Sequence, residues 1–255
     1  MMIINKLNNL LNNTSHHDIN HVIGKYIKKN LDQIGYMSIK DLAEATYVSQ
    51  AKISKFIKTL GYDNFIAFKD DCRHMTQVKE LVIEDQKENL NLDYKKHVIT
   101  SLETIKDNLL NVDEKMIEKL VYQLHLADEI YLYGNAYSNM LCQYVQYESD
   151  FIGKKVIVID ELVNRDYVMK ENSLIIMISV DGHSIKNEKR EVRKLLKLNA
   201  RKWLITTNHD KIEELDLFDH VLLVPSEHTE SKDRRILIRY LLDTIIGRFQ
   251  YLYKD

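Results

Sequence analysis

Hydrophobic and polar positions between residues 38 and 61 predict two short helices joined by a tight turn. Ser38 and Asp41 have the spacing of a capping box at the start of the first helix. Thr46 to Val48 interrupts the pattern, and Ser49 then stands where an N-cap would begin a second helix. One face of this second helix is apolar at intervals of three and four residues, through Ile53, Phe56, Ile57 and Leu60. The segment therefore predicts a helical hairpin with one buried side.

The opposite face of the second helix is basic. It carries Lys55 and Lys58, flanked by Lys52, and no Asp or Glu occurs from Ala45 through Tyr62. Uncompensated lysines on a short helix behind a tight turn are typical of a helix-turn-helix that binds DNA. The candidate DNA-contacting residues are Ser49, Gln50, Lys52, Ser54, Lys55 and Lys58. The alternative is an ordinary helical hairpin with a solvated lysine face.

Three further helices are expected around this hairpin. Residues 1–13 have an apolar side, Asp18 is placed to cap a helix that follows it, and residues 62–74 form another helix with Phe65 and Phe68 facing inward. We therefore expect a helical domain over residues 1–77. Residues 78–93 are charged and contain no Gly or Pro, so they fit a linker, either a helical spacer or a flexible segment.

The pattern changes in the second part of the chain, residues 94–255. After two helices, short apolar runs alternate with helical stretches, which is typical of a parallel sheet covered on both faces. The expected strands are Ile130–Tyr133, Val156–Ile159, Leu174–Ile178, Trp203–Thr206 and Val221–Val224. The expected helices between them lie near residues 137–152, 161–169, 185–199 and 211–216, and Ser231–Tyr253 forms a final long helix. This predicts an α/β domain with a five-stranded, mostly parallel, doubly wound sheet.

Charge and cysteine content add two constraints. The formal net charge of the chain is −2, but residues 1–77 hold ten Lys and Arg against seven Asp and Glu. A basic N-terminal part on a more acidic body suits DNA binding. Cys72 and Cys142 lie far apart without the spacing of metal ligands, so we expect reduced thiols and no metal. No signal peptide or membrane-length apolar run is visible, and we expect a cytoplasmic protein.

Two loops of the predicted sheet are candidates for ligand binding. One is Gly134 to Ser138, and the other is Ser179 to Ser184; each follows a strand and precedes a helix. Both couple a glycine to hydroxyl groups at a helix N-terminus, where backbone N–H groups favour an anion. The alternative is that Gly and Ser only form strand-to-helix turns.

The first part of the chain resembles the N-terminal DNA-binding domain of RpiR-type bacterial transcriptional regulators. That domain typically reads leu-ala-x-x-x-x-val-ser-x-x-thr-ile-x-arg-phe-x-x-x-leu-gly-phe. The matching residues here are Leu42, Ala43, Val48, Ser49, Ile53, Phe56, Leu60, Gly61, Tyr62, Phe65, Phe68 and Lys69. Lys52 stands where the family usually has threonine, and Lys55 where it usually has arginine. The resemblance implies a DNA-binding head.

The second part, from about Ala127 to Tyr253, resembles a sugar isomerase (SIS) domain, the usual partner of this head and a sensor of phosphosugars. The resemblance implies an effector site at Gly134, Ser138, Ser179, Asp181, Gly182, Ser184 and Glu227. Ala136 replaces the second glycine of the family's first turn, and Asp181 replaces a serine of its second turn. A carboxylate at a phosphate site repels the phosphate. Three readings stay open: Asp181 turns away, the ligand is not a simple phosphosugar, or the site has lost its ligand.

These residues predict a transcriptional regulator whose SIS-like domain senses a phosphorylated sugar and alters operator binding. The expected partners are a double-stranded DNA operator, a phosphosugar effector and a second copy of the chain, as a homodimer or homotetramer. No cofactor, no membrane and no catalytic residue is expected. The alternative is a phosphosugar isomerase with a helical appendage, for which Glu227, His228 and His183 are of a suitable type as a catalytic base.

Overall fold

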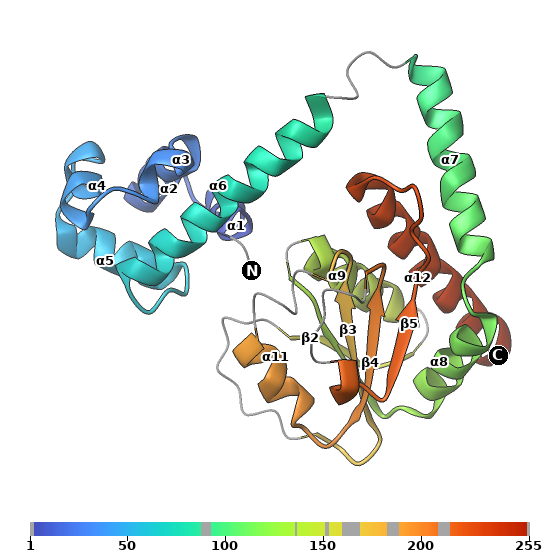
Figure 1. Cartoon of the computed structure of the whole chain (residues 1–255). Coiled ribbons are helices and arrows are strands. Elements are labelled where there is room, and N and C mark those ends of the chain that lie inside the picture. The colour runs from blue at the N-terminus through green and yellow to red at the C-terminus, as the bar shows by residue number, and fades with distance from the viewer. Residues whose placement is uncertain are drawn as a thin grey trace. The chain divides into compact units, whose positions relative to one another are not determined.

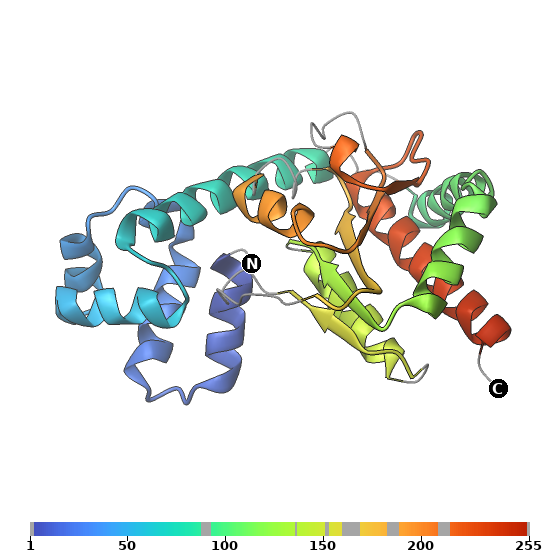
Figure 2. The same ribbon diagram turned by 90° about the horizontal axis from the view of Figure 1, so that it is seen from below.

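The structure, a computed structural model, consists of two compact units, Met1–Leu92 and Asp93–Asp255. It describes residues 3–87, 93–135, 137–150, 153–159, 169–182, 189–208 and 215–253. Figures 1 and 2 show the helices of the first unit and the sheet with its covering helices in the second. Each unit has a hydrophobic core of its own and is described separately.

The first unit is entirely helical over its described residues. Its helices are α1 (Ile3–Asn13), α2 (Ile19–Lys29), α3 (Leu31–Ile34), α4 (Ile39–Ala45), α5 (Gln50–Thr59) and α6 (Phe65–Lys87). Asp18 caps α2 as predicted, because its side chain accepts a hydrogen bond from the backbone N–H of Asn20. Ile23, Phe56 and Phe68 are fully buried where the helices meet. The helical fold of this region is confirmed, and α3 is a helix that the hydrophobic pattern did not predict.

Helix α6 differs from the expected helix over residues 62–74 at both ends. It begins at Phe65, because the Asn64 side chain accepts a hydrogen bond from the backbone N–H of Ala67 at 2.9 Å and so caps the helix. It then continues to Lys87. Residues 78–87, for which the sequence left a helical spacer and a flexible segment open, therefore lie in a helix.

The second unit is built on a five-stranded sheet, and all of its strand pairs are parallel. The strands are β1 (Glu129–Tyr133), β2 (Val156–Val158), β3 (Ser173–Ser179), β4 (Arg201–Thr206) and β5 (His220–Leu223), in the spatial order β2-β1-β3-β4-β5. Each strand begins and ends within two residues of its prediction. The reversal of strand order beside β1 is that of a doubly wound sheet, which confirms the predicted fold class.

Helices cover both faces of this sheet (Figure 1). One face packs against α7 (Tyr94–Leu110), α8 (Glu114–Leu126), α9 (Tyr137–Ser149) and α12 (Ser231–Tyr253). The other packs against α11 (Lys189–Leu196) and the 3-10 turn η1 (Leu215–Leu217). Helices α9 and α11 lie within the predicted ranges 137–152 and 185–199. The helices expected near 161–169 and 211–216 fall almost entirely outside the described residues.

Burial explains why β1 and β3 form the centre of the sheet. Every residue of both strands is buried, as expected for parallel strands covered on two faces. The two cysteines are buried and free, and burial raises the pKa of the Cys72 thiol to about 12. Across the described parts of the chain, no helix combines the length and the hydrophobicity that spanning a membrane requires.

Candidate functional site

The turn between α4 and α5 has a defined hydrogen-bonded geometry. At the end of α4 the backbone N–H of Val48 donates to Ala43 O at 2.9 Å, and that of Tyr47 donates to Glu44 O at 3.1 Å. This pair of bonds is a Schellman motif. The Ser49 side chain then caps α5, because its Oγ accepts a hydrogen bond from the backbone N–H of Lys52 at 3.2 Å. The predicted helix-turn-helix geometry is present.

Helix α4 begins with the predicted capping box. The Asp41 backbone N–H donates to Ser38 Oγ at 3.1 Å, and the Ser38 backbone N–H donates to Asp41 Oδ2 at 2.9 Å. The hydrogen bond from the Ser38 hydroxyl lowers the pKa of the Asp41 carboxyl. Since both bonds satisfy donors that the first turn leaves free, the capping box fixes where α4 starts relative to the turn.

Helix α5 turns its apolar stripe into the core and its lysines outward. Ile53, Phe56 and Ile57 are buried, whereas Lys55 and Lys58 are exposed. Of the other predicted DNA-contacting residues, Ser49 and Gln50 are exposed, and Lys52 and Ser54 are half-buried. Among the described residues, none forms an ion pair with any of the three lysines. The outward face of α5 therefore has positive charge available for an anionic partner.

The predicted effector loops meet at the carboxyl edge of the sheet, because β1 and β3 are adjacent parallel strands. Gly134 is required where it stands, since a Cβ on it would lie 2.8 Å from backbone and side-chain carbons of Ser138. Ser138 is buried at the start of α9, and its Oγ accepts a hydrogen bond from the backbone N–H of Val180 at 3.4 Å. Ser138 thus links the two loops directly.

Two buried polar atoms at this edge have no hydrogen-bond partner within the described parts of the chain: Ser179 Oγ and Asn208 Oδ1. Ser179 is the last residue of β3, is only 1% exposed, and pairs in register with Thr206 of β4. A buried polar group without a partner is costly, and native proteins usually retain one for a ligand, an ion or a water. The carboxyl ends of β3 and β4 therefore have unused hydrogen-bonding capacity.

Asp181 has a partner that the sequence pattern did not indicate. Arg234, in the first turns of α12, donates from Nη1 to Asp181 Oδ1 at 3.2 Å. Arg234 Nε is buried and has no acceptor among the described residues. The only signal in the sequence was the basic run Lys232-Asp-Arg-Arg235 at the start of the last helix. The carboxylate at the position of the family's serine is therefore balanced by a guanidinium.

The remaining predicted effector residues are placed differently. Gly182 has a φ of 75°, a left-handed conformation that glycine adopts without strain. Glu227 is exposed, and its backbone is fixed to α7 because its N–H donates to Asn108 Oδ1 at 3.1 Å. No described contact joins Glu227 to Ser138 or Ser179. Ser184 and His183 lie outside the described residues.

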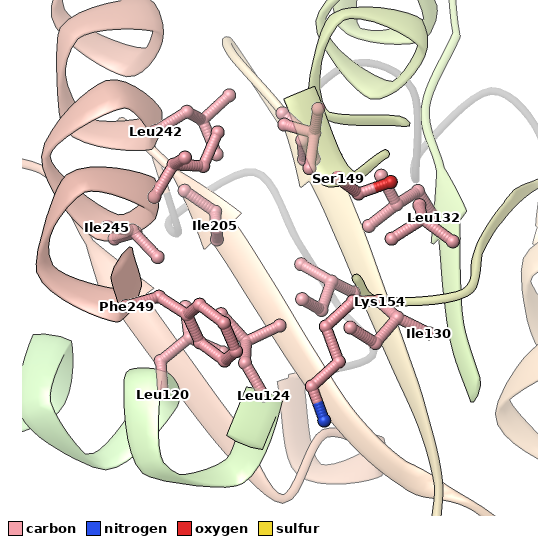
Figure 3. Close-up of a pocket in the computed structure, with 15 residues that line it drawn as sticks. Leu120, Leu124, Ile130, Leu132, Ser149, Lys154, Ile205, Leu242, Ile245 and Phe249 are labelled. Carbon is pink, nitrogen blue, oxygen red and sulfur yellow. The ribbon is translucent and has the colours of Figure 1, made fainter. Parts of the chain in front are cut away.

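A separate cavity of about 40 Å³ lies between the sheet and α8, α9 and α12 (Figure 3). Its lining is aliphatic and aromatic apart from Ser149 and Lys154. The Lys154 ammonium donates to the backbone oxygens of His125 at 2.5 Å and Ala127 at 3.1 Å. An apolar space of this size stays dry and does not admit a sugar. The cavity is a packing defect of the core, distinct from the carboxyl edge of the sheet.

Metal binding has no candidate in the described regions, where no three His, Cys, Asp or Glu side chains come together in a way that could hold an ion. The polar groups at the sheet edge are hydroxyls, an amide and an Asp–Arg pair. Such groups bind a ligand by hydrogen bonds and charge.

Comparison with known proteins identifies the first unit. Residues 1–75 match the family model described as a helix-turn-helix domain of the rpiR family. An uncharacterized HTH-type transcriptional regulator of Clostridium perfringens is 27% identical over 221 residues, which cover 80% of this chain and 76% of the relative. The HTH-type transcriptional regulator RpiR of Escherichia coli K12 is 26% identical over 224 residues, covering 83% and 73%. Both relatives are thus named as transcriptional regulators over most of their length.

The second unit has the fold of a sugar-phosphate isomerase domain. A solved structure from Listeria monocytogenes, of a protein whose proposed role is that of a sugar-phosphate isomerase, aligns with a TM-score of 0.50 and 13% identity. The alignment covers 63% of this chain and 92% of the listerial chain. At this identity the likeness concerns the fold alone. It agrees with the resemblance to the SIS domain stated from the sequence.

Proposed function

We propose that this chain, a transcriptional regulator of the RpiR family, binds operator DNA through α5 and senses a phosphorylated sugar at the carboxyl edge of its sheet. The observation that carries the proposal is the outward face of α5. It presents three lysines without an ion pair to any described residue, behind a capped and hydrogen-bonded turn. A phosphate backbone is the partner whose charge and shape this face fits.

The DNA-binding assignment comprises the six residues predicted from the sequence. Lys52, Lys55 and Lys58 supply charge to phosphates, while Gln50 and Ser54 are available to base edges in the major groove. Ser49 caps α5, and the N-terminal end of that helix favours a phosphate. Two copies of the chain would read two half-sites, so we propose a homodimer or homotetramer. A cytoplasmic location follows from a chromosomal DNA partner.

The effector assignment rests on hydrogen-bonding groups that the described protein leaves unused. Ser179 Oγ and Arg234 Nε are buried without partners, and Ser138 keeps its own hydroxyl hydrogen free to donate. Donors of this kind suit a phosphate together with sugar hydroxyls. Gly134, Gly182, Asp181, Ser184 and Glu227 complete the predicted site. The listerial neighbour's proposed role also concerns a sugar phosphate.

Sensing fits the site better than turnover. Isomerising a phosphosugar needs a base within hydrogen-bond reach of the substrate's carbon acid. Glu227 is exposed, and its recorded hydrogen bonds, to Asn108, are made by the backbone. We therefore propose no catalytic residue and no cofactor. An attached DNA-binding unit gives the ligand a purpose, provided that binding favours one arrangement of the paired units over another.

Two measurements test the proposal on the full-length chain. A labelled DNA duplex, selected from a random library by the protein itself, should be retained at physiological salt and released as salt is raised. A thermal-shift screen against a panel of sugar phosphates, with the unphosphorylated sugars as controls, should give a rise in melting temperature for the phosphorylated members alone. Conversion of a panel member into an isomer would favour the enzyme alternative instead.

A further inference from the structure

Tyr47 occupies a backbone position that usually belongs to glycine. Its φ is 55°, in the left-handed region, and it is the residue that ends α4 in the Schellman motif. Helix α5 ends in the same motif, since the Gly61 N–H donates to Lys58 O at 2.9 Å and the Tyr62 N–H donates to Ile57 O at 3.1 Å. There the left-handed residue is Gly61, with a φ of 79°. The same turn is thus built once with glycine and once with tyrosine.

Folding does not account for the tyrosine. A left-handed conformation is strained for a bulky residue and free of strain for glycine, and asparagine tolerates it well. The Tyr47 side chain is 96% exposed, so its ring buries almost nothing against the described residues of its unit. Its backbone N–H makes the turn's hydrogen bond, which any residue except proline would also make. The side chain therefore has a cost in the free protein without a compensating contact.

The position of Tyr47 offers such a contact in the DNA complex. Tyr47 lies two residues before Ser49, the N-cap of α5, and next to the end of the helix that meets DNA. It precedes α5 and is not part of the face that enters the groove, so its phenol is placed for the backbone that flanks the groove. A phenol hydroxyl is a common donor to phosphate oxygens.

We propose that Tyr47 donates its phenol O–H to a phosphate of the operator backbone and fixes the orientation of α5. This inference rests on the proposed DNA binding through α5. The contact is neutral, so it releases no counterion. It also carries no base information, because phosphates are alike in every sequence. Loss of the contact should therefore weaken binding to all sequences equally and leave the salt dependence unchanged.

Three variants of the full-length chain separate the ring, the hydroxyl and the backbone. Tyr47→Phe keeps the ring and removes only the hydroxyl. Tyr47→Ala removes the side chain beyond Cβ and keeps the strained φ, whereas Tyr47→Gly also relieves the strain. Tyr94→Phe is the control, since Tyr94 is a 78% exposed tyrosine of the second unit. Binding to the selected duplex and to a scrambled duplex is measured by fluorescence anisotropy over a salt series, and melting temperature by circular dichroism.

The proposal expects Tyr47→Phe, Tyr47→Ala and Tyr47→Gly each to lose about tenfold in affinity for both duplexes, with the salt slope of the wild type. Tyr47→Gly should melt no lower than the wild type, which separates the loss of binding from a loss of folding. Wild-type affinity in Tyr47→Phe, or in Tyr47→Gly, would overturn the proposal. If alanine at the three α5 lysines also leaves DNA affinity unchanged, the proposed function fails as well. If only the lysine variant weakens binding, the role of Tyr47 alone fails.

Discussion

Arg234 and Asp181 form an ion pair, N–O distance 3.2 Å, that joins the last helix of the sheet unit to the loop after β3. Both side chains are partly exposed, 27% for Arg234 and 23% for Asp181. The arginine that best suits an incoming phosphate is therefore already engaged by a carboxylate of the protein. A phosphosugar has to share or displace Asp181, which makes Asp181 an internal competitor of the proposed ligand.

Replacing Asp181 by serine should tighten phosphosugar binding. Asp181→Ser removes a negative charge, frees Arg234 and restores a hydroxyl donor, so we expect affinity to rise about tenfold. Arg234→Ala should abolish detectable binding, because it leaves Asp181 unpaired beside the ligand's charge. Isothermal titration calorimetry with the sugar phosphate found in the thermal-shift screen measures both effects.

Glu118→Gln is the control for this comparison, since it breaks the carboxylate–arginine bond of Glu118 to Arg248, 2.7 Å, elsewhere in the same unit. It should leave ligand affinity unchanged. If Asp181→Ser binds the ligand more weakly than the wild type, the carboxylate contacts the ligand directly and the competitor model is wrong.

Ser179 should matter for the ligand and not for folding. Its Oγ is buried and has no partner among the described residues, so Ser179→Ala removes no hydrogen bond from the free protein. We expect the free energy of unfolding to stay the same or rise slightly. Ligand affinity should fall about ten- to hundredfold, the effect of one hydrogen bond to a charged group.

Ser173 provides a matched control for Ser179. It lies at the other end of β3, is also 1% exposed, and its Oγ is likewise buried without a partner in the described structure. Ser173→Ala should therefore change neither ligand affinity nor stability. Equal loss of ligand binding in both variants would argue against a site at the carboxyl edge of the sheet.

Removing the α5 lysines should weaken DNA binding without unfolding the first unit. In the triple alanine variant of Lys52, Lys55 and Lys58, each lost phosphate contact reduces the slope of log K against log salt by about one unit. The apolar stripe of α5 stays intact, so the melting temperature should change little. The matched control is the triple alanine variant of Lys25, Lys28 and Lys29, which are exposed on α2 and carry the same charge. Equal losses in both variants would indicate nonspecific attraction instead of a contact by α5.

Local signals made the first unit predictable. Ser38, Asp41 and Ser49 lie within three residues of the backbone groups that they cap, and α5 buries the stripe that its spacing indicates. Helix α3 was not predicted, because its four residues are too few to display a helical period. The extension of α6 to Lys87 could not be decided either, because its charged residues suit both a helix and a linker.

The strands of the second unit were predictable for a similar reason, since continuous apolar runs mark strands buried on two faces. The proposed effector site was only partly predictable. Gly134, Ser138 and Ser179 follow from where strands end, and the topology brings them to one edge. Arg234 was missed because it is 53 residues from Asp181, and no pattern in the sequence specifies which loop a helix side chain contacts.

The final prediction concerns Glu129, the first residue of β1, at the opposite end of the sheet. Its carboxylate is 5% exposed and pairs with Lys155 and, at 3.0 Å, with Lys170, and it accepts a hydrogen bond from the Tyr131 hydroxyl at 2.8 Å. The bond from Lys155, followed by those from Lys170 and Tyr131, lowers the pKa of Glu129 from 4.5 to about 2. A carboxyl whose pKa is lower in the folded state contributes stability above its unfolded value, and this contribution is lost as the pH falls.

Glu129→Gln should therefore be less stable than the wild type at neutral pH, because it loses both ion pairs. The difference in free energy of unfolding should shrink as the pH falls from 4.5 towards 2, where the wild-type carboxyl also becomes protonated. Urea unfolding of the two proteins over this pH range measures the difference, and Glu114→Gln, at an exposed position on α8, should track the wild type throughout. A gap that stays constant across the range would mean that the lost contacts of Glu129 are not electrostatic.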